Sequence, residues 1–368
     1  MIAACSRAVR PTQHLPRHDL KEGPRVCFFE LTIACDLACQ HCRASAQPKP
    51  EHGQLTTAQA RMLIDQLTEF EEPPLLVLTG GDPFKRRDLF AIIDHAVDSG
   101  LEVSITPSAT PLVTADAIRR LRDAGVRRMA VSIDGADAAT HDRFRGTPGS
   151  FERSLEMLVT AAGLDLSTQV NTTVTPHNAD QIDPLADLLA ELGIEMWSVF
   201  FLVPIGRAAV LPRLNAAECE AVFEKLWQQS QRQPYDIKTT EAPHYRRYQV
   251  LRRSRTTSTN GQSAARPRSL TLGLNDGKGV MFVSATGAIQ PSGFLPIECG
   301  RFPADHPVNI YRYSPVFRAL RDVRRLEGKC AVCEFRRVCG GSRARAYALT
   351  GNMLAQEPDC AYFPEDCR

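Results

Sequence analysis

The sequence predicts an α/β fold: a partial (β/α)6 barrel followed by a small cysteine-rich module. Strand-like and helix-like runs alternate from residue 25 to about residue 230, which is typical of parallel strands joined by right-handed crossovers. Cysteines gather near both ends of the chain at the short spacings that metal ligands have. Together these observations predict a barrel that carries one cysteine site and a smaller unit that carries another.

Six strands are expected where short runs are rich in apolar and β-branched residues, at 25–32, 75–79, 101–106, 127–133, 166–174 and 195–202. Amphipathic helices are expected between and after them, at 56–70, 87–99, 114–124, 150–162, 180–192 and 216–231. Several helices begin at a capping residue, such as Thr56 or Thr114, and several end at a glycine, such as Gly100 or Gly125. These strand–helix units complete the barrel.

Four regions follow from this pattern: an N-terminal extension (1–24), the barrel (25–232), a connecting segment with a flexible linker (233–269) and a C-terminal module (270–368). Residues 254–268 lack periodicity and large apolar side chains, so we expect a linker or mobile loop there. The C-terminal module is expected to be separate, with short strands at 279–284 and 288–290 and a helix at 314–325.

Composition narrows the class of protein. A chain of 368 residues suggests about two domains. The net charge of +2 gives no sign of nucleic-acid binding, and no apolar run approaches the roughly 18 residues of a membrane span. The N-terminus lacks the pattern of a signal peptide. Twelve cysteines at metal-ligand spacing then favour the reducing cytoplasm.

The cysteine run Cys35-x3-Cys39-x2-Cys42 follows the first expected strand and is the most informative motif. Three thiolates can hold three irons of a [4Fe–4S] cube and leave the fourth iron open to a small molecule. Zinc is the first alternative, but no second ligand pair follows within the next forty residues. A disulfide is the second, and it would leave one cysteine over.

In this spacing and position, the motif resembles the signature of the radical S-adenosylmethionine (SAM) enzymes, and the resemblance extends from about residue 25 to the end. It implies that SAM chelates the open iron and is reductively cleaved to a 5′-deoxyadenosyl radical, which abstracts hydrogen from a substrate. A flavodoxin or ferredoxin would supply the electron. Parallel barrels place such chemistry at the carboxyl ends of their strands.

The resemblance also implies which residues contact SAM, and all but Arg145 are expected at strand ends: Gly80, Gly81, Asp82, Ser108, Ser132, Asp134, Arg145 and Asn171. The Gly80-Gly81-Asp82 run would bind the methionyl amino group. Ser132 and Asp134 would face the ribose, and Arg145 would clamp the carboxylate unless it is a surface arginine. His41 would pack on SAM or the cluster unless it is a solvated loop histidine.

A second cysteine set reads Cys330-x2-Cys333-x5-Cys339-x20-Cys360. Four thiolates can close a second [4Fe–4S] cluster completely, and a structural zinc ribbon is the alternative. Cys299 or Cys367 is a possible replacement for Cys360 as the fourth ligand. Otherwise the leftover cysteines are ordinary thiols: Cys5, Cys27, Cys219, Cys299 and Cys367.

This module resembles the SPASM/twitch extension of radical SAM maturases, most closely the subset that acts on tetrapyrroles in d1-type haem synthesis and the alternative haem pathway. The runs that carry the resemblance are 29–39, 197–207, 291–296 and 339–351. Ser292 and Ser342 stand where a full SPASM domain would have further cysteines. One auxiliary cluster, and two clusters in all, is therefore the expected count.

The substrate is less constrained. Arginines at 246, 247, 252, 253, 343 and 345 suit a propionate-bearing porphyrin, or else form a solvated basic face. Trp197, Phe200 and Phe201 on the last expected strand would divide between helix packing and the border of a flat substrate. A tetrapyrrole-modifying enzyme and a maturase of a ribosomally made peptide are both consistent with these features. The SAM-site residues argue against a third class, a non-catalytic iron–sulfur scaffold.

Overall fold

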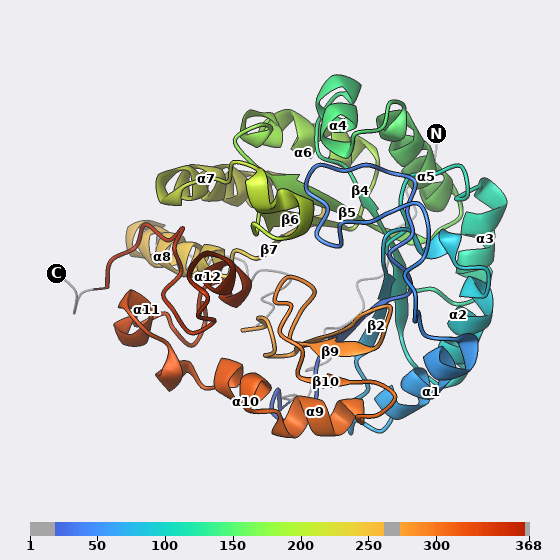
Figure 1. The fold of residues 1–368 in the computed structure, drawn as a ribbon. Coiled ribbons are helices and arrows are strands. Elements are labelled where there is room, and N and C mark those ends of the chain that lie inside the picture. The colour runs from blue at the N-terminus through green and yellow to red at the C-terminus, as the bar shows by residue number, and fades with distance from the viewer. Residues whose placement is uncertain (1–18, 261–272, 365–368) are drawn as a thin grey trace.

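The computed structural model describes residues 19–260 and 273–364, and its core is one ten-stranded sheet curved into an open barrel (Figure 1). The strand order is β10-β9-β8-β1-β2-β3-β4-β5-β6-β7. The strands have these bounds: β1 (Val26–Glu30), β2 (Leu75–Thr79), β3 (Val103–Ile105), β4 (Arg128–Ser132), β5 (Ser167–Val174), β6 (Met196–Phe201), β7 (Asp236–Thr240), β8 (Val280–Val283), β9 (Ala288–Gln290) and β10 (Gly300–Arg301).

Helices cover the outer face of the parallel strands, and further helices lie beyond the open side of the barrel (Figure 1). Their bounds are α1 (Thr57–Leu67), α2 (Leu89–Asp98), α3 (Ala115–Asp123), α4 (Ala138–Arg145), α5 (Ser150–Gly163), α6 (Ile182–Glu191), α7 (Ala216–Arg232), α8 (His244–Asn260), α9 (Pro307–Tyr313), α10 (Pro315–Arg321), α11 (Lys329–Val332) and α12 (Arg343–Thr350). Four 3₁₀ helices are η1 (Pro83–Lys85), η2 (Ala179–Gln181), η3 (Gly206–Val210) and η4 (Val323–Arg325). In the described residues no helix is long and apolar enough to cross a membrane.

All six strands and six helices expected for the barrel are present, each within a few residues of the expected bounds. Between residues 25 and 260, one strand and two α-helices were missed. Strand β7 reads Asp-Ile-Lys-Thr-Thr, and this mostly polar edge strand lacks the apolar signal of a buried parallel strand. Helix α4 spans only eight residues and buries only His141 and Phe144. Helix α8 has no apolar stripe strong enough to be recognised from its sequence.

The two faces of the barrel strands differ in burial. Along β5 the pattern alternates strictly: Thr168, Val170 and Thr172 are buried, whereas Gln169 and Asn171 are only partly buried. Because successive side chains of a strand point to opposite faces, the buried set packs under the helices and the other set lines the barrel interior. This interior, called the lumen below, therefore remains partly accessible.

The C-terminal strands belong to the same sheet as the barrel, so this region is not the separate module that the sequence suggested. Strand β8 pairs with β1 in parallel, with Val26 opposite Val280, and β9 and β10 follow in antiparallel pairing. Both expected short strands are present, and the expected helix is α10 with η4. Residues 254–260 belong to α8, whose first turn packs on Phe223, so the first part of the expected linker is helical. Residues 261–268 lie outside the described residues.

Candidate active site

The loop with Cys35, Cys39 and Cys42 follows β1 at the carboxyl edge of the barrel and crosses over the lumen (Figure 1). Each sulfur accepts a hydrogen bond. The amide of Leu37 donates to Cys35 Sγ at 3.3 Å, the amide of Ala46 to Cys42 Sγ at 3.3 Å and Arg145 to Cys39 Sγ at 3.7 Å. At Cys35, burial raises the pKa of the thiol, and the hydrogen bonds from Ser108 and Leu37 counter part of this effect. The donor set thus fits a thiolate-bound cluster.

In the described residues no three Cys, His, Asp or Glu side chains converge tightly enough to hold a single metal ion. A [4Fe–4S] cluster does not need its cysteines to converge on one point, because each thiolate binds a different iron.

Arg207 holds the cysteine loop in place, a role the sequence analysis did not assign. Its guanidinium donates to the carbonyl oxygens of Cys39 and Ala46, both at 2.8 Å, and its amide donates to the carbonyl of Cys42 at 3.1 Å. The preceding Gly206 has φ +55°, and a Cβ there would collide with the carbonyl oxygen of Arg43. The run 203–207 carried part of the family resemblance. The sequence alone, however, does not show that this run contacts the cysteine loop.

The Gly80-Gly81-Asp82 turn packs directly against the start of the cysteine loop. The amide of Gly81 donates to the carbonyl of Thr32, and that of Asp82 to the carbonyl of Ala34, each at 2.7 Å. A Cβ at either glycine would collide with backbone atoms of residues 32–34, so close approach requires glycine at both positions. The end of β2 is therefore fixed beside the cysteines.

The Asp82 side chain is fully buried and already has partners. Its carboxylate accepts hydrogen bonds from Thr110 Oγ1 at 2.7 Å and from the amides of Phe84 at 3.1 Å and Ser108 at 3.4 Å. Ser108 Oγ in turn donates to the carbonyl of Gly81 at 2.8 Å and lies 3.5 Å from Cys35 Sγ. Asp82 and Ser108 thus connect the glycine turn to the first cysteine and hold both in position.

His41 of the cysteine loop forms a second group with Asp134, which is fully buried, and Arg145. Arg145 forms an ion pair with Asp134 at 2.6 Å, and its side chain is only 13% exposed, so it is not a surface arginine. Asp134 also accepts from the amide of Thr173 at 2.7 Å. His41 stacks on Phe144 at 4.1 Å between ring centroids and its side chain is only 10% exposed, so the alternative of a solvated histidine is wrong. Burial, together with Arg145 and Arg207, holds the pKa of His41 well below its usual value.

Ser132 and Asn171 face the lumen on adjacent strands. They are register partners between β4 and β5, and Asn171 is also opposite Ser198 on β6. Asn171 accepts a hydrogen bond from Gln169 at 2.6 Å. Beside this row, Phe200 reaches toward Phe294 at 6.1 Å, whereas Trp197 and Phe201 are buried on the helix side. The expected division of these aromatic residues between the two faces is thus observed.

Cys330, Cys333, Cys339 and Cys360 line one pocket with an empty volume of about 370 Å³. The amide of Glu357 donates to Cys330 Sγ and that of Gly341 to Cys339 Sγ, each at 3.3 Å. Cys299 is not among the lining residues and donates to the carbonyl of Ile297 instead. Of the other leftover cysteines, Cys27 and Cys219 are buried, whereas Cys5 and Cys367 lie outside the described residues. The pocket therefore favours Cys360 as the fourth cysteine of this set.

A family model of the "Radical SAM superfamily" matches residues 29–189. The "AdoMet-dependent heme synthase" of Methanosarcina barkeri is 38% identical over 352 residues, which cover 94% of this chain and 98% of that relative. The chain belongs to the radical SAM superfamily. A protein of the same name from Nitratidesulfovibrio vulgaris is also 38% identical, over 96% of this chain and 97% of the relative. The "Pre-heme d1 synthase" of Dinoroseobacter shibae is 27% identical over 91% and 85%.

Solved structures share the fold of this radical SAM enzyme. SuiB of Streptococcus suis bound to S-adenosylmethionine superposes with a TM-score of 0.70 at 16% identity, over 94% of this chain and 78% of that chain. Native anSMEcpe bound to AdoMet and a peptide gives a TM-score of 0.61 at 15% identity, over 91% and 92%. The predicted α/β barrel and the family resemblance are confirmed, and an enzyme of this superfamily carries a [4Fe–4S] cluster and SAM.

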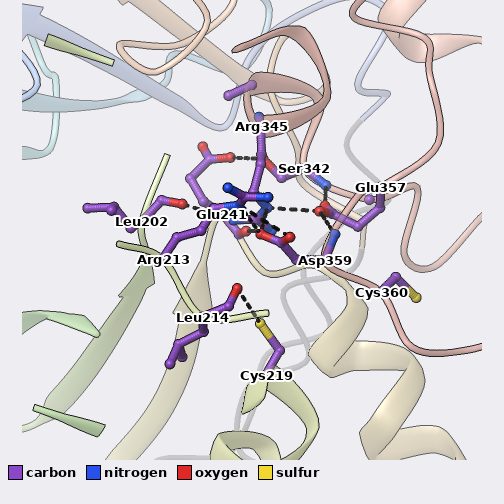
Figure 2. A network of polar contacts seen from close by, with 12 residues as sticks. Leu202, Arg213, Leu214, Cys219, Glu241, Ser342, Arg345, Glu357, Asp359 and Cys360 are labelled. Carbon is purple, nitrogen blue, oxygen red and sulfur yellow. Dashed lines mark hydrogen bonds and ion pairs between the residues drawn. The ribbon is translucent and has the colours of Figure 1, made fainter. Parts of the chain in front are cut away.

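Arg345 joins the barrel of this radical SAM enzyme to the C-terminal cysteine pocket (Figure 2). It pairs with Glu357 at 2.8 Å and with Asp359, next to Cys360, at 3.2 Å. It also donates to the carbonyl oxygens of Glu241 at 2.7 Å and Leu202 at 3.4 Å, just beyond β7 and β6. Burial alone would raise the pKa of Glu357, but the Arg345 guanidinium lowers it to about 2. The Arg345–Glu357 pair thus stays charged in the folded protein.

Ser292 and Ser342, which stand where further cysteines were expected, meet at one acidic pair. Ser292 Oγ donates to Asp276, and Ser342 Oγ donates to Glu241. The amide of Ala344 adds a hydrogen bond to Asp276 at 3.0 Å. Burial and the neighbouring Asp276 raise the pKa of Glu241 well above its usual value. Hydroxyl and carboxyl groups therefore fill this place in the fold.

The arginines that were expected to bind substrate or form a basic face instead have partners within the protein. Arg246 donates to the carbonyls of Leu274 and Val338, and Arg343 to those of Met353 and Ala355. The remaining pairs are Arg247 with Glu220, Arg252 with Glu224, and Arg253 over the ring of Trp227. A sequence does not show which arginines a fold uses internally. Because Arg252 is still 37% exposed, substrate binding or a basic face at this cluster stays a prediction.

Proposed function

We propose that this chain is a SAM-dependent haem synthase that acts on carboxylate-bearing side chains of an iron tetrapyrrole. The observation that carries the proposal is the 38% identity to proteins named "AdoMet-dependent heme synthase" over nearly the whole length of both chains. When bound, the cluster and SAM of this superfamily supply a 5′-deoxyadenosyl radical that abstracts hydrogen. The protein holds the reactants in place and excludes water.

The SAM contacts remain part of this proposal. Cys35, Cys39 and Cys42 would hold the cluster. The Sγ atoms of these cysteines already accept hydrogen bonds from Leu37, Ala46 and Arg145. The backbone of Gly80 and Gly81 would face the methionyl group, and Ser132 and Asn171 would face the ribose. Asp82, Ser108, Asp134 and Arg145 would position these groups, since their own side chains have partners inside the protein.

We also propose that Cys330, Cys333, Cys339 and Cys360 hold a second [4Fe–4S] cluster. Four cysteines line a single pocket, and two of the sulfurs accept hydrogen bonds from backbone amides. Arg247 and Lys329 also line this pocket and would offset the negative charge of four thiolates. A flavodoxin or ferredoxin is the proposed electron donor for SAM cleavage.

Anaerobic turnover tests the function. The reconstituted enzyme is mixed with SAM, dithionite and iron coproporphyrin III, a macrocycle with four propionates, and products are followed by mass spectrometry and Soret absorbance. We expect 5′-deoxyadenosine together with macrocycles that have lost carboxyl groups. The Cys35→Ala/Cys39→Ala/Cys42→Ala variant is the control and should yield neither product. Deoxyadenosine without any change in the macrocycle would contradict the proposal.

The alternative is maturation of a ribosomally made peptide. Proteins named "PqqA peptide cyclase" are 25–29% identical over 93% of this chain, less similar than the haem synthases. Crosslinking of a precursor peptide, with the tetrapyrrole left unchanged, would favour this alternative.

A further inference from the structure

Lys238 is the central residue of β7, the edge strand that the sequence analysis missed. It lies opposite Ser198 of β6, which is opposite Asn171 of β5, which is opposite Ser132 of β4. Register partners in parallel strands point to the same face of a sheet. Ile237 next to it is buried on the helix side, so Lys238 enters the lumen at the end of the row that begins with Ser132.

The amino group of Lys238 has no hydrogen bond or ion pair within residues 19–260 and 273–364. Its charged neighbour is Arg128, which carries the same sign and is bound to Glu195 at 3.0 Å and Ser167 at 2.9 Å. Burial and then Arg128 lower the pKa of Lys238 to about 8. A half-buried ammonium group without a counterion is poorly solvated, so this position favours an incoming anion.

Two cations beside the cysteine loop are already paired. Arg43 forms an ion pair with Glu30 at 2.9 Å, and Arg145 forms one with Asp134 at 2.6 Å. The arginines of the C-terminal region have partners inside the protein, as described above. Lys238 is therefore well suited to recognise a negatively charged group that enters the barrel.

We propose that Lys238 binds a carboxylate of the substrate and orients it in the lumen. This inference rests on the proposed function and adds to it a residue that recognises the substrate. SAM is not the source of this carboxylate in the proposed arrangement, because its methionyl end would lie at the cysteine loop and the Gly80-Gly81 turn, and no hydrogen bond joins Lys238 to either. A lysine ammonium binds a carboxylate as a point charge, so arginine should retain part of the function.

Equilibrium binding tests this inference without turnover. Iron coproporphyrin III and its tetramethyl ester are titrated by Soret absorbance into the anaerobically reconstituted full chain, with no reductant present. Lys238→Met should raise the Kd for the acid roughly ten- to a hundredfold and leave the Kd for the ester unchanged. Lys238→Arg should recover most of the affinity. Lys21→Met, at an exposed lysine, is the matched control and should change neither value.

The outcomes separate this inference from the proposed function. If the wild type converts the tetrapyrrole but Lys238→Met binds the acid as tightly as the wild type, only the role of Lys238 is wrong. Equal weakening for acid and ester would also overturn it, because the effect would not depend on charge. If the wild type binds neither macrocycle, the proposed function is wrong, and the proposed role of Lys238 is wrong as well. Misfolding is not expected to confuse the result, since Met is also a long unbranched side chain and removes an unpaired, half-buried charge.

Discussion

Arg345 and Glu357 form an ion pair of 2.8 Å in which each side chain is only 1% exposed. Arg345 also bonds the carbonyl oxygens of Leu202 and Glu241, just beyond β6 and β7, so one guanidinium joins the rim of the barrel to the segment before Cys360. The distance between the lumen and the C-terminal cysteine pocket is therefore fixed by a contact that is shielded from solvent and salt.

Replacing Arg345 should destabilise the fold. Arg345→Met leaves the carboxylate of Glu357 buried and unpaired, and such a loss costs about 3–5 kcal/mol of unfolding free energy. Denaturant unfolding under anaerobic conditions measures it. Arg324→Met is the matched control, because Arg324 is paired with Asp322 but 85% exposed, and we expect it to have little effect. An Arg345→Met protein as stable as the control would show that the network carries little energy.

Metal content tests the two cysteine sets. Two [4Fe–4S] clusters require about eight irons and eight sulfides per reconstituted chain. Changing Cys35, Cys39 and Cys42 to Ala should leave about four irons, because the C-terminal pocket is untouched. Four irons and one zinc in the wild type would contradict the second cluster and show that the C-terminal cysteines bind zinc.

Cys360→Ala should separate the two halves of the reaction. Cys360 lines the C-terminal pocket, whereas the cysteine loop that supports SAM cleavage follows β1. Deoxyadenosine formed without substrate should therefore persist, while product formation falls or disappears. Both are measured in one anaerobic assay. Cys299→Ala is the control, since Cys299 lies outside this pocket. Full turnover and intact metal content in Cys360→Ala would show that another residue completes the set.

Arg207→Ala should loosen the cysteine loop. The variant loses the two hydrogen bonds to the carbonyls of Cys39 and Ala46, so we expect incomplete occupancy of the first cluster and slower SAM cleavage. Iron content and deoxyadenosine yield measure the two effects. Arg207→Lys should behave much as Ala does, because one ammonium does not reproduce the fork of a guanidinium. Wild-type iron content in Arg207→Ala would show that the loop does not depend on this clamp.

Lys238 should make stability depend on pH in the alkaline range. The unfolded chain holds a proton on this lysine up to about pH 10.5, whereas the folded protein releases it near pH 8. Stability should therefore rise between pH 8 and pH 10.5, by roughly 1–3 kcal/mol because the side chain is partly accessible. Below pH 8 both states are protonated and this contribution is constant. Unfolding of the wild type and Lys238→Met across this range measures the difference, which should disappear in the variant.

The comparison between sequence and structure shows which signals one chain carries. Strands β1 to β6 were predictable because burial on the helix side demands apolar residues, whereas β7 has a single apolar residue, Ile237, on that side. The fourth cysteine of the C-terminal set followed from spacing, and the pocket includes Cys360. Partners distant in sequence were not predictable. Arg345 was predicted to bind substrate, because the residues next to it in the sequence do not show that Glu357 and Asp359 pair with it in the fold.

The pairing of β1 has a consequence for synthesis of the chain. Val26 lies beside Leu75 on one side and beside Val280 on the other, so the second edge of β1 stays unpaired until the ribosome has made more than three-quarters of the protein. The thiols of residues 35–42 emerge early, beside a strand whose other neighbour does not yet exist. During this interval the unpaired edge of β1 is exposed to pairing with other chains. Any factor that delivers iron and sulfide before the chain leaves the ribosome would act on an incompletely folded barrel.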